Sequence, residues 1–484
     1  MNGEILAFIV YFVAIVGVGI YFFFKEKGDA TQANFFLGGR QMGPWVAAMS
    51  AQASDMSAWL LMGLPGSILA FGFGQMWIGI GLALGTAANW IFVAKRLRKF
   101  SSAAGDAITV PQYLGNRFLS KSNALQVICA IIFFVCFTIY VASAYVAGAS
   151  VFTAIFPSLS SHAAMIIFAL AMLLITFFGG FKAVCWTDFF QGMLVLGSMF
   201  IAPIFAAFML DTSSMSALPG GYLNPFSSWQ DIVSGLAWGL GYFGMPHIII
   251  RFMSIKSQKD LKKSAKIGIT WTLLIVFFAT LIGVIGRLFL GFDESINENS
   301  LVFIQIVRKI FPGVISGILL SAVLAASMST ADSQLLAASS AFSSDVYKPV
   351  IRKGKASDKE MMWTGRIVVL GISVAALIIA SNPNAGSIMA LVSNAWGIFG
   401  AAFGPAIMLS LFWKRFNFKG AVAGIITGAA VDILWYAFLT STGIYELLPG
   451  FVLGLIAAVV VTLCTNEPSK EVYELFDKAE KFDE

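Results

Sequence analysis

The sequence is poor in charged residues, which make up 12% of its 484 positions, about half the share found in soluble proteins. Residues of the group AVILMFWYC account for 58%, including 45 phenylalanines, and there are 46 glycines. A soluble fold has too little interior to bury so much apolar surface, whereas a bilayer accepts it and tolerates glycine in its helices. The composition therefore argues against a soluble enzyme and predicts an all-α polytopic membrane protein.

Cysteine and histidine are also scarce. The four cysteines lie in or beside apolar runs without CxxC spacing, which argues against a disulfide framework and a zinc site. The two histidines, His162 and His247, belong to no HExxH motif, and no GxSxG element occurs. No acid ring or carbonyl-filter sequence indicates a channel. We therefore expect neither an enzyme nor a channel, and no nucleic-acid partner.

Thirteen apolar runs approach the length of about 20 residues that a membrane-spanning helix needs. The first run lacks the basic leader and small-residue cleavage site of a signal peptide, so we expect it to be retained. No linker or charged block separates a soluble domain, and the longest hydrophilic piece is the tail 466–484. The runs are 5–24, 44–70, 73–94, 126–154, 163–180, 189–210, 232–252, 267–290, 313–341, 367–381, 387–412, 420–440 and 448–465.

Lysine and arginine are distributed unevenly between the segments that join these runs. If the N-terminus lies outside, 28 of the 31 basic residues face the cytoplasm, and only Arg287, Arg308 and Lys309 face outward. Cytoplasmic segments of membrane proteins carry this excess of positive charge. The pattern predicts an outside N-terminus and an inside C-terminus.

Two of the runs contain residues that interrupt a helix. Run 44–70 has Asp55 and Ser57 near its middle, and run 232–252 has Pro246 among several glycines. These are the second and seventh runs, so they cross the membrane in opposite directions. Broken helices at corresponding positions indicate inverted repeats around a transporter site at the midplane. Glycine-rich packing faces without a ligand would have a similar composition.

Carboxylates inside apolar runs are costly and point to function. Asp55 is the strongest candidate, because a carboxylate beside unpaired carbonyls suits a small hard cation. Asp188 either caps its helix, where a negative charge is favoured, or has a role in function. Asp332 follows a hydroxyl-rich segment, and we interpret Asp432, on a later run, as structural.

Hydroxyl groups cluster in run 313–341. Ser329 and Thr330 share a helical face with Ala326, so one carbonyl and two hydroxyls can converge there. Several neutral oxygens with one nearby carboxylate suit sodium. The alternative is that these hydroxyls only bond back to carbonyls of their own helix.

Several segments resemble the sodium/solute symporter family, and the likeness extends from about residue 35 to residue 450. The resemblance implies a leucine-transporter-type core of two inverted five-helix repeats, 44–210 and 232–412. It also implies an extra N-terminal helix, 5–24, and two peripheral helices within 420–465. The resembling segments are LGGR at 37–40, ASDMSAWLLMGLPG at 53–66, GGF at 179–181, WTD at 186–188, WGLGYFGMPH at 238–247 and MST at 328–330.

The same resemblance implies uptake of L-proline coupled to sodium by alternating access. Another small solute, such as a sugar, a vitamin carboxylate or a different amino acid, is the alternative. The implied sodium ligands are the carbonyls of Ala53, Met56 and Ala326 and the hydroxyls of Ser329 and Thr330. Asp55 matches a carboxylate needed for sodium coupling.

The resemblance also implies a substrate pocket, and it matches Arg40 to the inner mouth of the pathway. Asp188, Asp332 and Ser333 are candidates for a second cation site or an exit path, although an acid at position 332 is not shared by every family member. The implied pocket residues are Ser57, Trp59, Gly63, Tyr140, Trp238, Tyr242 and Pro246. We expect a multi-pass protein of a bacterial inner membrane, surrounded by lipid, with sodium as coupling ion and no obligate protein partner.

Overall fold

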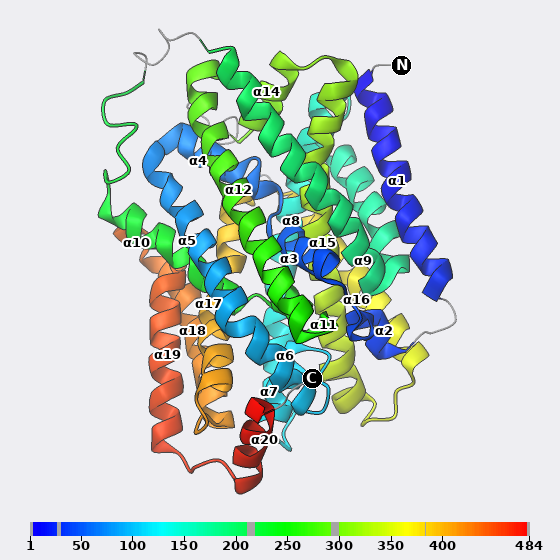
Figure 1. The fold of residues 1–484 in the computed structure, drawn as a ribbon, viewed down its shortest axis with the longest axis vertical. Helices are drawn as coiled ribbons and strands as arrows, with labels where there is room; N and C mark the ends of the chain where they lie inside the picture. The colour runs from blue at the N-terminus through cyan, green and yellow to red at the C-terminus, as the bar shows by residue number, and fades with distance from the viewer. Residues whose placement is uncertain (1–2, 27–30, 211–217, 292–299, 383, 482–484) are drawn as a thin grey trace.

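The computed structural model describes residues 3–26, 31–210, 218–291, 300–382 and 384–481. Within these ranges all regular secondary structure is helical, without β-strands. The helices form one elongated bundle (Figure 1). The only strand-like pairing in the described part is an isolated bridge between Met42 and Ile255. The predicted all-α class is confirmed. The last three residues of the predicted tail lie outside the described residues.

The first half of the chain contains the long helices α8 and α9 and a series of shorter ones. These are α1 (Gly3–Glu26), α2 (Gln32–Leu37), α3 (Pro44–Asp55), α4 (Gly63–Phe71), α5 (Met76–Ala88), α6 (Ala94–Ala103), α7 (Val110–Arg117), α8 (Ala124–Ile155) and α9 (Ser161–Phe208).

The second half has the same mixture. Its helices are α10 (Trp229–Ala237), α11 (Pro246–Ser254), α12 (Gln258–Leu290), α14 (Val302–Ile310), α15 (Gly313–Ala341), α16 (Asp358–Ala380), α17 (Ile388–Phe412), α18 (Phe418–Phe438), α19 (Leu447–Cys464) and α20 (Lys470–Lys481).

Each of the thirteen apolar runs lies on helical structure, but not every run is one long helix. Ten helices of the described chain are long and apolar enough to span a membrane, and the bent pair 229–243 and 246–254 makes up to eleven. The two remaining runs contain the shorter apolar helices Ala58–Phe71 and Ser161–Phe177. The count of thirteen spans and the orientation of the termini stay predictions, as do the two repeat boundaries.

The first predicted interruption is present. α3 ends at Asp55, a 3₁₀ turn follows at Ala58–Leu60, and α4 begins at Gly63. Met56 and Ser57 between them have non-helical ψ angles of 73° and −169°, so the chain leaves the helix for these residues. Their surroundings are protein, because both side chains are buried. A break in a spanning helix requires this covering.

The second predicted interruption is also present. α10 tightens into a 3₁₀ segment, Trp238–Phe243, and α11 starts again at Pro246 with a bend of 45°. Proline is well placed at the first turn of a helix, where its missing N–H is not needed. Gly241 allows close packing here: a Cβ on it would lie 2.0 Å from Nε1 of Trp396.

A third interruption is not predicted from the apolar runs. The runs 163–180 and 189–210 lie on α9, which consists of two helices that meet at a kink at Gly180, with φ of 63° and ψ of −175°. The second helix continues without a loop from Gly180 to Phe208. A positive φ is readily adopted by glycine alone. The segment that was expected to join two separate spans is therefore helical.

α15 lies at the centre of the bundle (Figure 1). Its side chains are almost continuously buried from Leu319 to Ala341, and it packs against α1, α3, α8 and α9. α18 and α19 pack against each other and against α17 at the opposite side of the molecule from α1. The fold thus surrounds the α3–α4 break with α15, α12 and α17.

We predict that Gly241→Ala destabilises the protein. The added methyl group would displace the Trp396 indole, whose Nε1 donates to the Trp238 carbonyl at 2.9 Å, and overpacking of this kind costs about 1–3 kcal/mol. Thermal unfolding in detergent measures the loss. Gly371→Ala is the control, because a Cβ at this exposed α16 position meets nothing within 4 Å. Equal unfolding temperatures would contradict the close-packing argument.

Candidate substrate and sodium site

The two interrupted helices touch each other at their breaks. The Tyr242 hydroxyl, in the second break, donates a hydrogen bond to Oδ2 of Asp55 at the end of α3. Nearby, the rings of Trp59 and Trp238 lie with centroids 5.9 Å apart. Residues nearly 200 positions apart therefore form one buried junction, and four of the predicted site residues belong to it.

The predicted sodium ligands converge on the other side of this junction. Ser329 Oγ donates to the Ala53 carbonyl at 2.8 Å and lies 3.1 Å from the Ala326 carbonyl, and Thr330 Oγ1 lies 3.3 Å from the Ala53 carbonyl. Two carbonyls and two hydroxyls from α3 and α15 thus meet in a buried place. Neutral oxygens of this kind fit a hard monovalent cation, toward which hydroxyl lone pairs can turn.

Met56, the fifth predicted ligand, lies at the break itself. It follows α3 directly, three residues after Ala53, and its side chain is buried. The adjoining turn, Ala58–Leu60, packs against α15, the helix that carries the hydroxyls. The structure thus places Met56 in the segment that faces the oxygen cluster, and its role as a ligand stays a prediction.

Several buried polar atoms at the junction have no hydrogen-bond partner among the described groups. They include Oδ1 of Asp55, Oγ of Ser57, Nε1 of Trp59 and the Tyr140 hydroxyl. Tyr140 lies close enough to Ser57 and Trp59 for hydrogen-bond contact with both, but none of the three polar groups has a described partner at good hydrogen-bond geometry. Buried polar groups are nearly always paired, so a cluster of unpaired ones indicates a place for a polar ligand.

Aromatic rings form the wall beside these polar atoms. Trp238 stands between Trp59, Trp396 and Tyr445, with ring centroids 5.9, 6.2 and 5.0 Å away. Tyr242 meets Trp396 edge-on at 5.1 Å. Such rings provide a large apolar contact surface that suits an aliphatic ring.

The last two predicted pocket residues begin helices. Gly63 is the first residue of α4, whose N-cap makes no side-chain hydrogen bond, and a Cβ on Gly63 would lie 3.3 Å from Trp59. Pro246 is the first residue of α11, and its neighbour His247 packs against Tyr140 with ring centroids 6.4 Å apart. Both lie at the edges of the junction.

Asp188 and Ser333 meet in a second buried cluster. Oδ2 of Asp188 accepts hydrogen bonds from Ser50 at 2.6 Å and Ser333 at 3.3 Å, and it pairs with Nη2 of Arg251 at 3.4 Å. Arg251 also donates to Ser333 and to the His247 carbonyl. Ser50 and Ser333 lie one turn beyond Ala53 and Ser329, so this cluster is about 5 Å along the helices from the oxygen cluster.

Asp332 does not join this cluster by a hydrogen bond. Its Oδ1 accepts from Thr176 Oγ1 at 2.5 Å, and its Oδ2 has no described partner. The structure therefore brings Asp188 and Ser333 together and gives Asp332 a partner of its own on α9. Asp432, interpreted as structural, lies on α18 against Gly397 of α17, where a Cβ would come within 2.7 Å of its Oδ2.

Arg40, which the resemblance matches to the inner mouth of the pathway, has well-defined polar partners, and its role at the mouth stays a prediction. Its guanidinium pairs with Asp106 at 2.9 Å and donates to the carbonyls of Ala107 and Met253, both at 2.8 Å. Met253 belongs to α11, and Ala107 to the segment between α6 and α7. One side chain thereby ties three elements together at this end of the bundle.

Sequence reasoning missed Arg251, Ser50, Asn89 and Trp396. Arg251 was counted only as a basic residue of a cytoplasmic segment, yet its side chain is 1% exposed. Asn89 donates to the Tyr242 carbonyl at 2.9 Å and begins a π-helical segment, Asn89–Val93, a type frequent at functional sites. A lone asparagine within an apolar run was the available signal. Trp396 has no such signal.

Comparison with known proteins gives this geometry its context. A family model described as the sodium:solute symporter family matches residues 35–428. The osmoregulated proline transporter OpuE of Bacillus subtilis is 41% identical over 98% of this chain and 97% of its own length. The chain belongs to the sodium:solute symporter family.

Two further relatives extend over most of the symporter. The high-affinity proline transporter PutP of Bacillus subtilis is 42% identical and covers 94% of this chain and 97% of its own length. The sodium/proline symporter of Staphylococcus aureus strain USA300 is 41% identical, and the match covers 95% of this chain and 92% of that protein. The family and these relatives are transporters, so the expectation that the symporter is not an enzyme is confirmed.

Solved structures of distant sequence share the fold of the symporter. A substrate-bound, outward-open, sodium-coupled sialic acid symporter has a TM-score of 0.79 with 21% identity, covering 97% of this chain and 99% of its own. MhsT in complex with L-phenylalanine has a TM-score of 0.56 with 16% identity, covering 87% and 97%. The leucine-transporter-type fold is therefore confirmed.

We predict that Tyr242→Phe weakens the response of the symporter to sodium. Removing the hydroxyl leaves a buried carboxylate oxygen of Asp55 without its donor, which costs about 1–3 kcal/mol, and frees the carboxylate to reorient beside the oxygen cluster. The measurement is the rise in unfolding temperature on adding sodium chloride in place of potassium chloride.

Tyr113→Phe is the matched control for this measurement. The Tyr113 hydroxyl is also buried and lies 3.0 Å from Ser410 Oγ, between α7 and α17 and away from the junction. We expect this variant to lose a similar hydrogen bond and to keep its sodium response. Equal loss of the response in both variants would reduce the Asp55–Tyr242 contact to a structural role.

Proposed function

We propose that the symporter imports L-proline together with sodium by alternating access. The family is a sodium:solute symporter family, and the relatives at 41–42% identity are named as proline transporters. A sugar, a vitamin carboxylate or another amino acid is the competing class of substrate.

The observation that carries this proposal is the set of unpaired polar atoms beside an aromatic wall. Proline has a carboxylate, a secondary ammonium group and a small apolar ring. The unpaired Ser57 and Tyr140 hydroxyl oxygens can accept from the ammonium group. The ring fits against Trp59 and Trp238, whose indoles are 5.9 Å apart.

The substrate carboxylate has a natural place at the start of α4. The first N–H groups of a helix have no partner within the helix, and the helix dipole favours negative charge there. α4 begins at Gly63 without a side-chain cap. We assign the carboxylate to this end, beside Trp59 and Met389, which lie against the face of Gly63 that has no side chain.

The ion is proposed to bind between α3 and α15. The carbonyls of Ala53, Met56 and Ala326 and the hydroxyls of Ser329 and Thr330 would hold it, with Asp55 providing a negative field one turn away. Bound sodium would steady the unwound Met56–Ser57 segment, which also borders the proline pocket. Sodium then raises proline affinity, and linkage requires the converse.

The membrane potential adds to the driving force. Zwitterionic proline moving with one sodium ion transfers one positive charge, which is worth about 2.3 kcal/mol per 100 mV. Uptake should therefore be electrogenic and concentrative.

The Asp188 cluster is proposed as the inward path of the ion. It lies beyond the sodium ligands on both α3 and α15, and Arg251 of α11 closes it through its contacts with Asp188, Ser333 and the His247 carbonyl. Opening toward the cytoplasm would require α11 to withdraw this guanidinium. A second cation site would use Asp188, Ser333 and Asp332.

We place the symporter in a bacterial cell membrane, with its N-terminus outside and its C-terminus inside. The described chain has ten long apolar helices, and the named relatives come from bacteria. The charge asymmetry of the sequence supports this orientation.

Uptake of labelled L-proline into proteoliposomes tests the proposal. We expect accumulation with an inward sodium gradient and none with an equal potassium gradient. Asp55→Asn should abolish the accumulation, and Thr330→Val should weaken the apparent sodium affinity roughly tenfold or more, since it removes one oxygen from a charged ligand.

Ser321→Ala is the control for Thr330→Val. Ser321 lies on the same helix, and its hydroxyl bonds back to the Gly317 carbonyl at 2.8 Å, so we expect normal uptake. If sodium stabilises the protein thermally but does not drive proline uptake, the substrate assignment is wrong. If sodium has neither effect, the ion site is wrong.

We further predict that Asp188→Asn slows uptake and that Asp332→Asn alters sodium stoichiometry or the pH dependence of transport. Asp432→Asn serves as the control, because Asp432 is equally buried but lies on α18, one of the two predicted peripheral helices. Initial rates and sodium-to-proline flux ratios in the same vesicles measure these effects. Unchanged stoichiometry, sodium affinity and pH dependence in Asp332→Asn would exclude a second cation site at this residue.

A further inference from the structure

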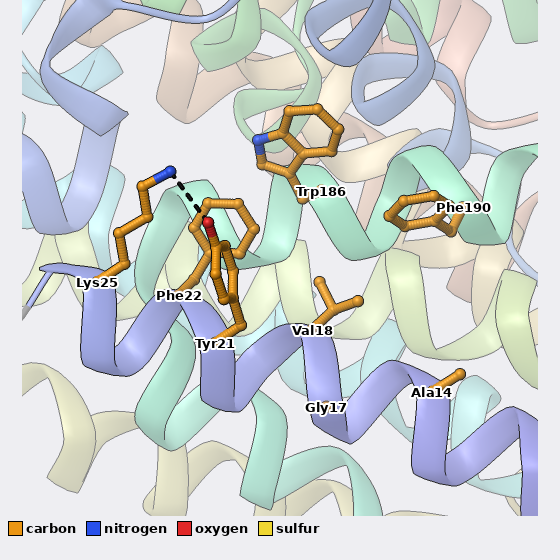
Figure 2. A pocket seen from close by; sticks show the side chains of 8 residues that line it. All are labelled: Ala14, Gly17, Val18, Tyr21, Phe22, Lys25, Trp186 and Phe190. Atoms are coloured by element: carbon orange, nitrogen blue, oxygen red, sulfur yellow. Dashed lines mark hydrogen bonds between the residues drawn. The ribbon is translucent and has the colours of Figure 1, made fainter.

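A cavity opens on the lipid-facing side of the molecule, away from the proposed transport path. It lies between α1 and α9, and its volume is about 530 Å³, within the range of ~300–1,000 Å³ typical of small-molecule sites. Figure 2 shows α1 forming one wall, from Ala14 to Lys25, with Trp186 and Phe190 of α9 opposite. Both helices are apolar enough to span a membrane.

The cavity has the length of one lipid leaflet. Ala14 and Lys25 are eleven residues apart on one helix, which corresponds to about 16 Å at 1.5 Å per residue. The hydrocarbon core of a bilayer is about 30 Å thick. An acyl chain lying along this stretch of α1 would therefore reach from the interface to the middle of the membrane.

The apolar part of the cavity has room for such a chain. Gly17 is exposed, and a Cβ built on it would meet nothing within 4 Å. On either side of this gap lie Val18 and Phe190, and further along Phe22 stacks on Trp186 with centroids 6.1 Å apart. Tyr21 and Phe22 lie beside Lys25, as expected for aromatic residues at a membrane interface, whereas Phe190 lies nearer to Ala14 (Figure 2).

The other end of the cavity is polar and positively charged. Lys25 Nζ donates to the Tyr21 hydroxyl at 3.3 Å and lies 5.3 Å and 5.8 Å from the ring centroids of Tyr21 and Phe22 (Figure 2). None of the ion pairs among the described side chains involves Lys25. An ammonium group has three N–H donors, so two stay available to an anion.

We propose that this cavity binds one anionic phospholipid. One acyl chain lies along α1 over Gly17 and against Phe190, and the phosphate group accepts hydrogen bonds from Lys25 and Tyr21. The charge of Lys25 selects an anionic lipid, such as phosphatidylglycerol, over a zwitterionic one, and the predicted orientation assigns the lipid to the cytoplasmic leaflet.

The position of the cavity gives the lipid a way to influence transport. Trp186 precedes Asp188 by two residues on α9, and one turn further Gln191 donates to the Tyr11 hydroxyl of α1 at 3.0 Å. A lipid that bridges α1 and α9 therefore holds the segment that carries the inner cluster. We expect phosphatidylglycerol to raise the unfolding temperature of the symporter.

Photolabelling of the purified full-length chain in nanodiscs tests the proposal. The probes are phosphatidylglycerol and phosphatidylcholine with the same diazirine-bearing acyl chain, and the labelled peptides are mapped by mass spectrometry. We expect labelling concentrated on residues 14–25 and 186–190, about fivefold stronger for phosphatidylglycerol, as one lysine near an anionic headgroup provides.

Two variants separate the two parts of the site. Gly17→Leu fills the apolar space and should abolish labelling by both lipids at these residues, whereas Gly371→Leu, at an equally open glycine of α16, should leave it unchanged. Lys25→Gln should remove the preference for phosphatidylglycerol. Lys266→Gln, at an exposed lysine near the start of α12, should keep it.

Three results would overturn the proposal. The first is labelling spread evenly over the lipid-facing helices, and the second is labelling of residues 14–25 that Gly17→Leu does not reduce. The third is a dimer in native mass spectrometry that Gly17→Leu dissociates, which would make the cavity an interface between two copies of the chain. The labelling needs no transport, so its failure is distinguishable from failure of the proposed function.

Discussion

A backbone group that loses its hydrogen bond inside a bilayer finds no water to replace it, so a spanning helix can break only where protein covers the break. The two interruptions of this chain satisfy the requirement by facing each other. Tyr242 donates to Asp55, and Trp59 lies against Trp238. α15 covers the remaining side, where Ser329 donates to the Ala53 carbonyl. The proposed binding of both substrates depends on this junction, since the same groups that satisfy the broken helices are those that an ion and an amino acid would contact.

Charge burial follows from the same constraint. A buried carboxylate is costly unless hydrogen bonds or an opposite charge compensate it. Asp188 has both at its Oδ2, from Ser50, Ser333 and Arg251, whereas Asp55 has a single hydroxyl donor and no cation; in each carboxylate Oδ1 has no described partner. The difference separates the proposed roles. The Asp188 carboxylate is paired with the Arg251 guanidinium, which must move before an ion can pass, whereas the Asp55 carboxylate remains able to respond to a sodium ion.

Much of this arrangement could be predicted from the sequence because its causes are local. The apolar runs predicted the helices, and Asp55, Ser57 and Pro246 within them predicted the breaks. The spacing of Ala326, Ser329 and Thr330 placed three oxygens on one face, and the Ala53 carbonyl, which the resemblance implied as a fourth, contacts both hydroxyls in the structure. What could not be predicted are partners chosen across the fold. The sequence pattern places Arg251 among the cytoplasmic basic residues, yet its side chain points into the protein and pairs with Asp188. The helical conformation of the segment after Gly180 was missed because the polar stretch around Lys182 resembles a loop, whereas the second part of α9 begins directly at the Gly180 kink.

The central helix has a further mechanical property. Between Ser321 and Ser333, α15 presents mainly alanine and serine to its neighbours, with Ala322, Ala325, Ala326 and Ala331 fully buried. Helices that meet through short side chains approach closely, and their ridges interlock only shallowly. A neighbour such as α3 can then slide or tilt along this surface without a change of rotamers in a bulky core. α15 thus offers α3 a surface of short side chains, over which a small shift requires little repacking.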